Sequence, residues 1–379
     1  MLFFCFLFLL IYVITLFLAA FFWLKLPSTK TEKIAQNKKL KKIAIIIAIR
    51  NEENNIENLL QDILAQTYPS EYIEIIVIND HSTDQSAEIV ANYAKKYTNI
   101  FLLSLPKFLE GKKQAIQYGI SKATSELIFT TDGDCRLQKL HIENICNFFA
   151  QTNAKLISSL VVFTKPNFLD TITYGGFIFQ SLDFAALIGI GAVSLSIGKA
   201  TMCNGANLAY TKAIFEEVGG FSGNEHIASG DDEFLLQKIA KKYPKEVHFL
   251  KNKDTIVSTE SSKTMYDFFQ QRKRWASKWK LHQQKHIAIV AIFIFILHSL
   301  SLGIMIWGVF EKNITDWAIL FWIIKSFAEL IFVGLIVQFV GLARYIFFMP
   351  FASLLYPVYA ISIGIASNQK GFIWKNRKF

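Results

Sequence analysis

The chain has 379 residues, of which 52% are hydrophobic and 15% aromatic, so it is longer than one typical domain and too apolar for an ordinary soluble protein of its size. Its formal net charge of +10 comes from basic residues that flank apolar segments, and attraction to anionic lipid head groups explains this better than nucleic-acid binding. Its four cysteines have no CxxC spacing, so neither a disulfide framework nor a zinc site is indicated.

The first predicted element is a membrane-spanning helix over residues 1–24. This segment carries no charge and is long enough to cross a hydrocarbon core of about 30 Å. It lacks the basic start and the short apolar run of a signal peptide, so an uncleaved anchor is the better interpretation. The positive-inside rule places the following residues in the cytoplasm and the N-terminus outside. The lysines that indicate this are Lys25, Lys30, Lys33, Lys38, Lys39, Lys41 and Lys42.

After the anchor, short apolar runs alternate with segments of helical spacing within a predicted cytoplasmic domain over residues 41–260. The runs are rich in branched residues and nearly all apolar, as expected of parallel strands covered on both faces. The pattern predicts a doubly wound α/β domain. The predicted strands are 43–49, 73–78 and 127–131, and the predicted helices are 54–66, 86–96 and 112–121, with Asn54 and Ser86 as helix starts.

A cluster of polar residues follows each of these predicted strands. The clusters are Arg50-Asn51-Glu52, Asn79-Asp80 and Asp132-Gly133-Asp134. In a doubly wound domain, ligands bind at the carboxyl ends of the strands, so the three clusters are expected to converge on one edge of one sheet. Solvated loops without a function would scatter such residues. The sequence therefore predicts a ligand site at this edge.

Residues 163–202 are apolar, contain glycine and have no strong period. Two interpretations stay open, an acceptor-binding insertion near the membrane, which we prefer, and a core helix. Further along, residues 264–286 interleave aromatic and basic side chains and predict an amphipathic helix that lies along the head groups. An interfacial helix does not explain the grouping Gln271-x-x-Arg274-Trp275.

The C-terminal region, residues 287–368, predicts further membrane segments. Lys325 and Glu329 lie four residues apart in the second of them, on one helix face where they can pair. The third contains Pro350 and Pro357. Counting every segment as a full crossing leaves the basic C-terminal tail outside, so we expect the proline-containing segment to be re-entrant or interfacial. The segments are 287–310, 317–340 and 345–368.

The ordered motifs from residue 41 to residue 275 closely resemble those of the family 2 inverting glycosyltransferases. The motifs are Arg50-Asn51-Glu52-Glu53, Asn79-Asp80-His81-Ser82-Thr83-Asp84, Gly111-Lys112, Asp132-Gly133-Asp134, Asn204-Gly205-Ala206-Asn207, Gly230-Asp231-Asp232-Glu233 and Gln271-x-x-Arg274-Trp275. The last two motifs and the membrane segments resemble the membrane-embedded branch. That branch holds ceramide glucosyltransferase-like enzymes and processive cellulose, hyaluronan and poly-N-acetylglucosamine synthases. The resemblance implies a GT-A-like nucleotide-sugar-binding domain.

The resemblance also implies a donor site. Asp80 would accept a hydrogen bond from the nucleotide base, with Arg50 and Glu52 lining the same pocket. Lys112 would lie near the diphosphate, although a solvated lysine at a helix start is an equal alternative. Asp80 could instead cap the next turn. The DxD motif would supply Asp134 as a ligand of Mg²⁺ or Mn²⁺ and Asp132 as a partner of the ribose or a second metal ligand.

For the chemical step, the resemblance implies that Asp232 is the general base that removes a proton from the acceptor hydroxyl. Asp231 lies beside it, and the two acids could also stabilise a helix N-terminus. One-step displacement inverts the anomeric centre. Gln271, Arg274 and Trp275 are associated in this branch with the leaving diphosphate or the acceptor sugar.

Three residues depart from the family pattern: Ala48 replaces a usual proline, Asn79 a frequent aspartate and Asp231 a common glutamate. The first two touch the nucleotide pocket, so UDP is the favoured but not the only nucleotide. The expected protein is a multi-pass enzyme of the inner cell membrane that transfers a sugar from a UDP-sugar to a lipid-linked or saccharide acceptor at the cytoplasmic face. A processive polysaccharide synthase is the near alternative, and an inactive nucleotide-binding membrane scaffold is the alternative from another class.

Overall fold

The computed structural model describes residues 2–27, 40–165, 171–223, 230–280, 285–368, 373–374 and 377–378. The chain forms two compact units. We call residues 26–164 and 194–260 the sheet unit, and residues 1–25, 165–193 and 261–379 the helical unit. Part of the predicted lysine cluster, namely Lys30, Lys33, Lys38 and Lys39, lies outside the described residues. The same holds for three stretches of the predicted domain and interfacial helix, 166–170, 224–229 and 281–284.

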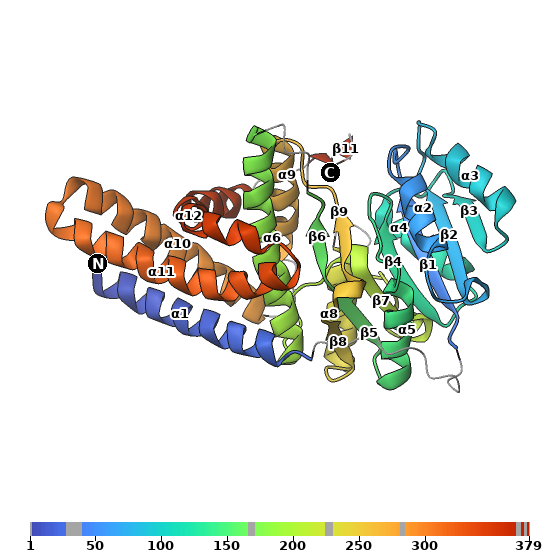
Figure 1. Ribbon diagram of the computed structural model, residues 1–379, viewed down its shortest axis with the longest axis horizontal. Coiled ribbons are helices and arrows are strands. Elements are labelled where there is room, and N and C mark those ends of the chain that lie inside the picture. The colour runs from blue at the N-terminus through green and yellow to red at the C-terminus, as the bar shows by residue number, and fades with distance from the viewer. Residues whose placement is uncertain are drawn as a thin grey trace. The chain divides into compact units, whose positions relative to one another are not determined.

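A seven-stranded sheet with the order β3-β2-β1-β4-β7-β5-β8 is the centre of the sheet unit (Figure 1). The first four strands in this order run parallel, whereas β7 pairs antiparallel with both β4 and β5. The strands are β1 (Ile43–Ile49), β2 (Ile73–Asn79), β3 (Ile100–Ser104), β4 (Leu127–Asp132), β5 (Leu156–Ser159), β7 (Leu208–Thr211) and β8 (Val247–Leu250). A separate parallel pair joins β6 (Val161–Phe163) to β9 (Val257–Thr259).

Burial of the central strands confirms the predicted doubly wound architecture. Residues 43–47 of β1 are all 0% exposed, which requires cover on both faces of the sheet. The helices of the sheet unit are α2 (Ile56–Leu64), α3 (Ser86–Lys96), α4 (Lys112–Lys122), α5 (His141–Gln151), α7 (Lys212–Glu217) and α8 (Asp231–Lys242). Short 3-10 turns are η1 (Ser70–Tyr72), η2 (Gly205–Asn207) and η3 (Lys253–Thr255).

The structure differs from the sequence prediction at two places in this unit. Strand β3 was not predicted, because its apolar run, residues 100–103, is too short to identify a strand by itself. It is the edge strand of the sheet and leaves Phe101 44% exposed. Helix α2 begins at Ile56 and not at Asn54, since the chain first makes a turn in which the amide of Asn55 donates to the Glu52 carbonyl at 2.9 Å. The Asn55 side chain donates to the Glu52 carboxylate and does not cap the helix.

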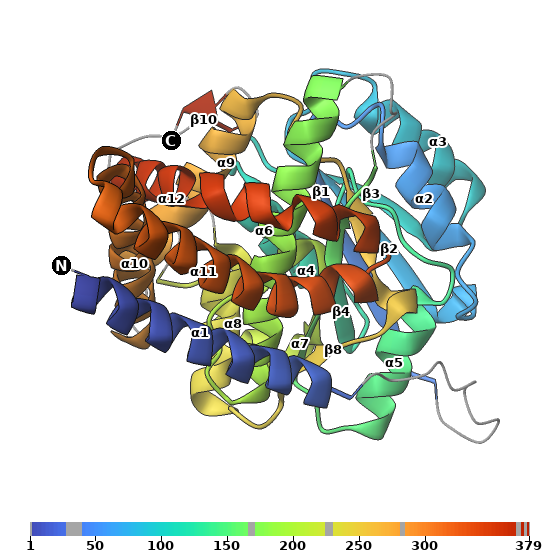
Figure 2. The ribbon, with the colours of Figure 1, turned by 60° about the vertical axis from the view of Figure 1, so that its left-hand side comes forward.

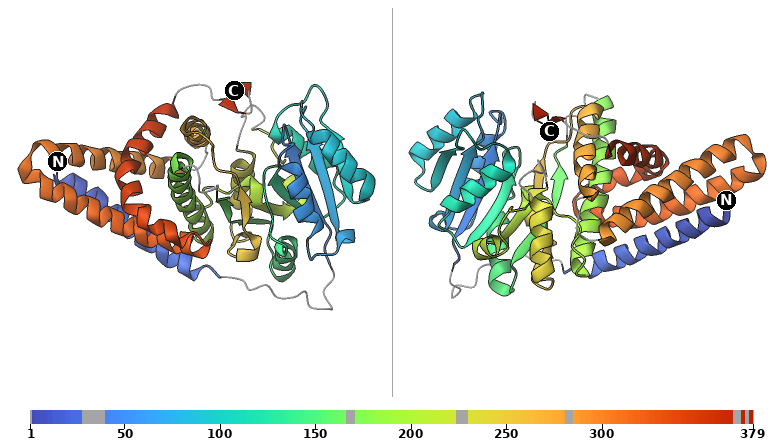
Figure 3. Two further views of the ribbon diagram at one scale, coloured as in Figure 1. Left: turned by 45° about the horizontal axis from the view of Figure 1, so that its top comes forward. Right: turned by 180° about the vertical axis from the view of Figure 1, so that it is seen from behind.

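In the helical unit, the long helices α1, α10, α11 and α12 pack along one another (Figures 2 and 3). Its elements are α1 (Leu2–Lys25), α6 (Thr171–Ser196), α9 (Met265–Ala276), η4 (Ser277–Lys280), α10 (Lys285–Phe310), α11 (Lys312–Phe339), η5 (Ala343–Phe348), α12 (Met349–Ala366), β10 (Ile373–Trp374) and β11 (Arg377–Lys378). The end of α6 after Val193 belongs to the sheet unit. The predicted interfacial helix is shorter than expected: its α-helical part ends at Ala276 and continues as a 3-10 turn. The prolines of the last segment lie in the first turn and the interior of α12.

Five of the described helices are long and apolar enough to cross a membrane. Four lie in the predicted segments, and the fifth is residues 175–196 of α6, for which no span was predicted. In the chain, α6 lies between β5 and β7, and these two strands pair in one sheet. A complete crossing by α6 would separate paired strands by a bilayer, so α6 cannot be a simple membrane span. Most of its side chains are buried, which fits the core-helix interpretation of this region better than a lipid-facing span.

Candidate active site

The register of the parallel strands brings the polar clusters to one edge of the sheet. Ile49 at the end of β1 is opposite Asn79 of β2, and Ala48 is opposite Asp132 of β4. The residues that follow these positions therefore leave the sheet at the same level, at the carboxyl ends of three adjacent strands. This is the convergence that the sequence predicts, and it places all candidate donor-site residues within the sheet unit.

Asp80, the candidate for nucleotide recognition, is almost fully buried and held from several sides. Its amide donates to the Ile49 carbonyl at 2.9 Å, and its carboxylate accepts from the Gly111 amide at 3.1 Å. The guanidinium of Arg50 donates to the Asp80 carbonyl at 2.9 Å. These contacts hold Asp80 at the end of β2, with its carboxylate against the backbone that leads into α4.

The turns after β1 and β2 interlock, and this explains several residues to which sequence reasoning assigned no function. Asn51 lies two residues after the end of β1, and His81 lies two residues after the end of β2. Both have positive φ values, 53° and 55°. The Ser82 hydroxyl accepts from the Asn51 amide at 3.1 Å, and the Asn51 side chain accepts from the Thr83 amide at 2.9 Å. The motif therefore builds a rigid wall beside Asp80.

Asp84 completes this wall. Its carboxylate accepts hydrogen bonds from the Ser86 amide and from the Glu53 amide, at 3.0 and 3.1 Å. Burial opposes the negative charge of Asp84, but the hydrogen bonds from Ser86 and Glu53 outweigh it and lower the pKa of this carboxyl group. Ser86 in turn accepts from the Glu52 amide at 2.7 Å, which fixes the backbone of the candidate pocket residue Glu52.

The DxD turn is packed tightly against the first turn. A Cβ atom at Gly133 would lie 3.0 Å from Glu52 Cγ and 3.1 Å from Ile49 Cγ2, so the backbone can approach this closely only without a side chain. The Cys135 amide donates to the Asp132 carbonyl at 3.1 Å and closes the turn. The requirement for glycine between the two aspartates is therefore steric.

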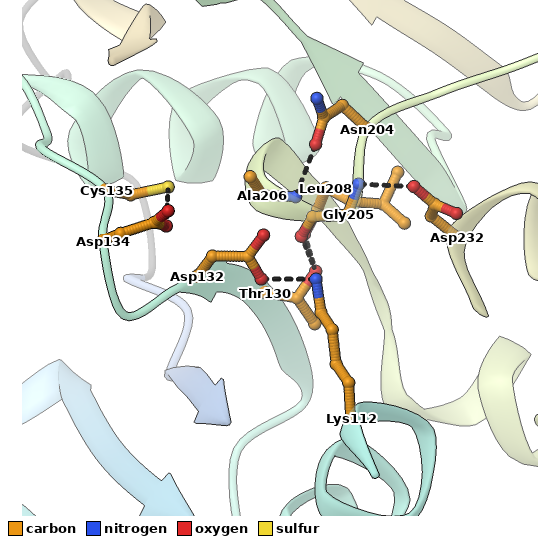
Figure 4. Close-up of polar contacts among 10 residues, drawn as sticks. All are labelled: Lys112, Thr130, Asp132, Asp134, Cys135, Asn204, Gly205, Ala206, Leu208 and Asp232. Atoms are coloured by element: carbon orange, nitrogen blue, oxygen red, sulfur yellow. Dashed lines mark hydrogen bonds and ion pairs between the residues drawn. The ribbon is translucent and has the colours of Figure 1, made fainter. Parts of the chain in front are cut away.

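Lys112 and Asp132 form an ion pair at this edge (Figure 4). Lys112 is the first residue of α4, and its ammonium group reaches the Asp132 carboxylate at the end of β4. Burial disfavours the charge on Lys112, but the carboxylates of Asp132 and Asp231 outweigh it and raise the pKa of the lysine. Lys112 is therefore a fixed cation among acids, which argues against the alternative of a solvated lysine.

Asp232 is the second residue of α8, and it joins this edge through the 3-10 turn η2. Its carboxylate accepts from the Gly205 amide at 2.8 Å, while the Gly205 carbonyl accepts from the Thr130 hydroxyl of β4 at 2.8 Å (Figure 4). Asn204 caps the same turn by accepting from the Ala206 amide at 2.9 Å. Sequence reasoning listed Gly205 only as part of a motif and did not single out Thr130.

Asp231 shares this environment. A Cβ atom built at Gly205 would lie 3.5 Å from a carboxylate oxygen of each of the two aspartates, Asp231 and Asp232, so both acids border the same small space. Burial raises the pKa of Asp231, Lys112 opposes this, and the charges of Asp232 and Asp132 raise the pKa further. The predicted adjacent acids are thus part of one electrostatic cluster with Lys112 and Asp132.

The carboxylates are a plausible donor set for a hard cation that shares its ligands with phosphate. Among the described residues, no group of three or more His, Cys, Asp or Glu side chains is close enough to form a complete metal site. Mg²⁺ and similar ions commonly take only one or two carboxylates from the protein and the remaining oxygens from phosphates and water. The ammonium group of Lys112 beside Asp132 shows that this position already attracts a cation. Asp132 and Asp134 therefore fit such an ion, although Asp134 here has the Cys135 thiol 3.8 Å away.

The remaining candidates, Gln271, Arg274 and Trp275, belong to α9 in the helical unit. All three side chains are partly exposed. The sheet unit therefore carries eight of the predicted site residues, and the helical unit carries the other three. The eight are Arg50, Glu52, Asp80, Lys112, Asp132, Asp134, Asp231 and Asp232.

Part of the chain matches known proteins. The family model "Glycosyl transferase family 2" matches residues 44–219. "Glycosyltransferase AglE" of Haloferax volcanii is 27% identical over 190 residues, which are 50% of this chain and 58% of that protein. A "Poly-beta-1,6-N-acetyl-D-glucosamine synthase" of Staphylococcus epidermidis is 25% identical over 248 residues, which are 64% of this chain and 55% of that protein. The chain thus spans a little over half the length of these relatives.

A solved structure is similar over nearly the whole chain. It is the mannosyltransferase PcManGT from Pyrobaculum calidifontis in complex with GDP-Man and Mn²⁺, with a TM-score of 0.57 and 18% sequence identity. The similarity covers 94% of this chain and 96% of that one, and it shows a shared fold of the GT-A type. Residues 44–219 of this chain thus match the sequence of a family 2 glycosyltransferase domain.

Proposed function

We propose that this protein is a membrane-bound, inverting, metal-dependent glycosyltransferase. It moves a sugar from a nucleotide sugar, with UDP favoured, to a lipid-linked or saccharide acceptor at the cytoplasmic face of the inner membrane. The observation that carries the proposal is the cluster of Asp132, Asp231 and Asp232 around Lys112, at the strand edge where this fold binds ligands.

Donor binding is assigned to the turns after β1 and β2 and to the start of α4. The buried carboxylate of Asp80 can accept a hydrogen bond from the N–H group of uracil. Lys112 supplies a positive charge where the diphosphate would lie. Asp132 and Asp134 would hold Mg²⁺ or Mn²⁺, which neutralises negative charge on the leaving diphosphate when bound. The solved mannosyltransferase with GDP-Man and Mn²⁺ supports a nucleotide sugar and a divalent cation as the ligands of this fold.

The chemical step is assigned to Asp232. Its carboxylate is held by the Gly205 amide at 2.8 Å, so its position is set before the acceptor binds. It removes the proton of the acceptor hydroxyl as the oxygen attacks the anomeric carbon, and the sugar–phosphate bond breaks on the opposite face. One displacement inverts the anomeric centre. Gln271, Arg274 and Trp275 are assigned to the diphosphate or the acceptor sugar, as in the membrane-embedded branch.

The membrane location rests on the apolar helices and the basic residues beside them. Helices α1, α10 and α11 expose many large apolar side chains, such as Phe3, Ile289 and Phe310. Their length and composition suit a bilayer. An acceptor attached to a lipid is then available in the same membrane.

A processive polysaccharide synthase is the second candidate. The similarity to the poly-β-1,6-N-acetyl-D-glucosamine synthase, which covers 64% of this chain, favours it. The small number of C-terminal membrane segments favours single transfer, because a polymer needs a channel of several helices. Mass spectrometry of the product distinguishes the two: one added sugar on a lipid excludes the synthase, and a ladder of repeating units excludes single transfer.

The function is tested with membranes that contain the full chain and a panel of labelled UDP-glucose, UDP-N-acetylglucosamine and GDP-mannose. We expect Mn²⁺-dependent transfer from one donor, and UDP-sugars in preference to GDP-mannose. Asp232→Asn should lose at least about 10²-fold in rate, because a general base contributes about 10²–10⁴-fold, while UDP binding with Mn²⁺ is retained. Transfer by Asp232→Asn at the parent rate would remove the proposed base.

A further inference from the structure

Two charged side chains form a buried ion pair in the helical unit, and sequence reasoning assigned no function to either. Arg272 of α9 is 3% exposed and Asp183 of α6 is 4% exposed. The Arg272 Nε atom lies 2.7 Å from Asp183 Oδ2, and the Tyr356 hydroxyl of α12 donates to Asp183 Oδ1 at 3.0 Å. A buried ion pair is costly unless hydrogen bonds support it. Both carboxylate oxygens of Asp183 accept such bonds, and the pair joins α9 to α6.

Arg272 also contacts two of the three candidate substrate residues on α9. Its Nη1 atom donates to Gln271 Oε1 at 2.7 Å. The centre of its guanidinium group lies 4.3 Å from the centre of the Trp275 ring and 4.7 Å from that of Phe268. One planar side chain is thus bonded to Asp183, to Gln271 and to the face of Trp275.

The chemistry of arginine determines how the amide of Gln271 is turned. A guanidinium group can only donate hydrogen bonds, so the Gln271 atom that faces it must be the oxygen. The NH₂ group of Gln271 is consequently left as a donor for another partner. An amide in this orientation suits an acceptor such as a phosphate oxygen or a sugar hydroxyl oxygen.

We infer that Arg272 is a positioning residue for the sugar-transfer reaction and that Asp183 anchors it. Arg272 holds Gln271 with its amide oxygen toward the guanidinium, which leaves the NH₂ group to donate to a substrate, and it packs on the Trp275 ring. This inference rests on the proposed function, in which Gln271 and Trp275 contact the diphosphate or the acceptor. It adds that Gln271 acts as a hydrogen-bond donor and that its orientation is set from α6.

The first test replaces Arg272 by lysine in the full-length chain in detergent. Lysine keeps the charge that Asp183 requires, but a single ammonium group cannot bond to Asp183 and Gln271 in the same geometry or stack flat on Trp275. We expect the transfer rate at saturating donor to fall by about 10-fold to about 10²-fold, the usual effect of a small misplacement. Binding of UDP with Mn²⁺, measured by calorimetry, should stay at the parent value. Lys273→Ala, which removes a neighbouring cation of the same helix, should leave both quantities unchanged.

Parent-like transfer by Arg272→Lys would overturn the inference. Loss of UDP binding together with transfer would also overturn it, since that result indicates general misfolding and not positioning. The proposed function is judged separately in the same assay, by the parent chain against Asp232→Asn. Suppose that the parent is active, Asp232→Asn is inactive and Arg272→Lys is unaffected. The proposed function then stands, and only the positioning of Gln271 by Arg272 is contradicted.

The second test examines the orientation of the amide. Gln271→Glu keeps an oxygen that accepts from Arg272 but lacks the NH₂ group. We expect it to lose transfer about as strongly as Gln271→Ala, with UDP binding unchanged, because both variants lack the donor. Transfer by Gln271→Glu at the parent rate would show that the NH₂ group is not used and would overturn the predicted orientation.

Discussion

At the scale of single residues, the environment of Asp231 disfavours the negative charge of its carboxyl group. Burial raises the pKa of its carboxyl group, Lys112 opposes this, and the charges of Asp232 and Asp132 raise the pKa further, while a backbone hydrogen bond lowers it. A cluster of three acids and one lysine lacks positive charge. A divalent cation supplies what is missing, which is one reason why the cluster suits a metal–diphosphate ligand.

The raised pKa of Asp231 predicts a pH-dependent stability. The folded protein keeps the proton of Asp231 to a higher pH than the unfolded chain, whose value is near the ordinary 3.8. As the pH rises through the folded-state pKa the proton is lost and the fold becomes less stable. Asp231→Asn mimics the protonated form, so it should raise the melting temperature at neutral pH. Below the ordinary value both proteins hold the proton or its mimic, and the difference should disappear.

This experiment uses the ligand-free chain in detergent, with thermal unfolding measured at several pH values. The control is the exposed residue Glu88. Asp62 is unsuitable as a control, because it pairs with Arg136. Glu88→Gln should leave the melting temperature unchanged at every pH. A stabilising effect of Asp231→Asn that is equal at all pH values would contradict the electrostatic explanation.

Asp134 is the residue on which metal-dependent nucleotide binding is expected to rest. Asp134→Ala removes one of the two carboxylates of the DxD turn, so UDP should bind at least about tenfold more weakly in the presence of Mn²⁺, a loss of about 1.4 kcal/mol. Binding of UDP without metal should stay as it is in the parent. Calorimetry with and without Mn²⁺ measures both quantities, and equal weakening in the two conditions would contradict the assignment.

At the scale of elements, a buried polar cluster joins three helices of the helical unit. Lys325 and Glu329 of α11 form the ion pair that their spacing predicts, at 2.7 Å. Glu329 also accepts from the Tyr12 hydroxyl of α1 at 2.9 Å, and Lys325 donates to the Ser353 hydroxyl of α12 at 3.0 Å. The sequence predicts the pair, but the partners on α1 and α12 depend on helix packing.

Removing one partner of this pair should destabilise the helical unit. Glu329→Gln leaves Lys325 buried without a counter-charge, at a cost of about 3 kcal/mol. The double variant Lys325→Met with Glu329→Leu removes both charges and should be closer to the parent. The exposed pair of Lys41 and Glu126 is the control, because breaking it by Glu126→Gln should cost about 0–1 kcal/mol. Chemical unfolding in detergent measures these differences, and equal costs for the two pairs would argue against the importance of burial.

At the scale of the whole molecule, the pairing of β5 with β7 restricts the membrane topology. The segments before and after α6 in the chain must lie on one side of the bilayer, although α6 is long and apolar enough to cross it. Hydropathy alone would count α6 as a crossing and would invert the predicted side of everything that follows. The sheet excludes this, because paired strands cannot be separated by a membrane.

Labelling of introduced cysteines tests this topology. Cysteines at the exposed positions Glu88 and Glu216, one before and one after α6, should both react with an impermeant maleimide only from the cytoplasmic side. A cysteine at Glu311, between α10 and α11, should react only from the other side. The background carries Cys203→Ser, since Cys203 is half-buried and the other three native cysteines are buried. Opposite labelling of positions 88 and 216 would contradict a non-crossing α6.

Much of the donor site could be predicted from the sequence, for a physical reason. Parallel strands that are buried on both faces are continuous apolar runs, and the polar residues that end each run must meet at one edge. Arg50, Asp80 and Asp132 follow this rule. Strand β3 and helix α6 could not be predicted in this way, because β3 is a short apolar run at the edge of the sheet and the largely buried α6 has no polar face to reveal its period.

The sequence by itself determined the order of the motifs, the apolar segments and the family, because these depend on residue types and on short spacings along the chain. Only the tertiary structure decided that the Gly205 amide holds Asp232, that Lys112 pairs with Asp132, and that Arg272 bonds to both Asp183 and Gln271. The contacts of Gly205 with Asp232, of Lys112 with Asp132 and of Arg272 with Asp183 join residues that lie far apart in the sequence. No local sequence pattern predicts such contacts. They depend on how strands and helices pack, which is a property of the whole fold.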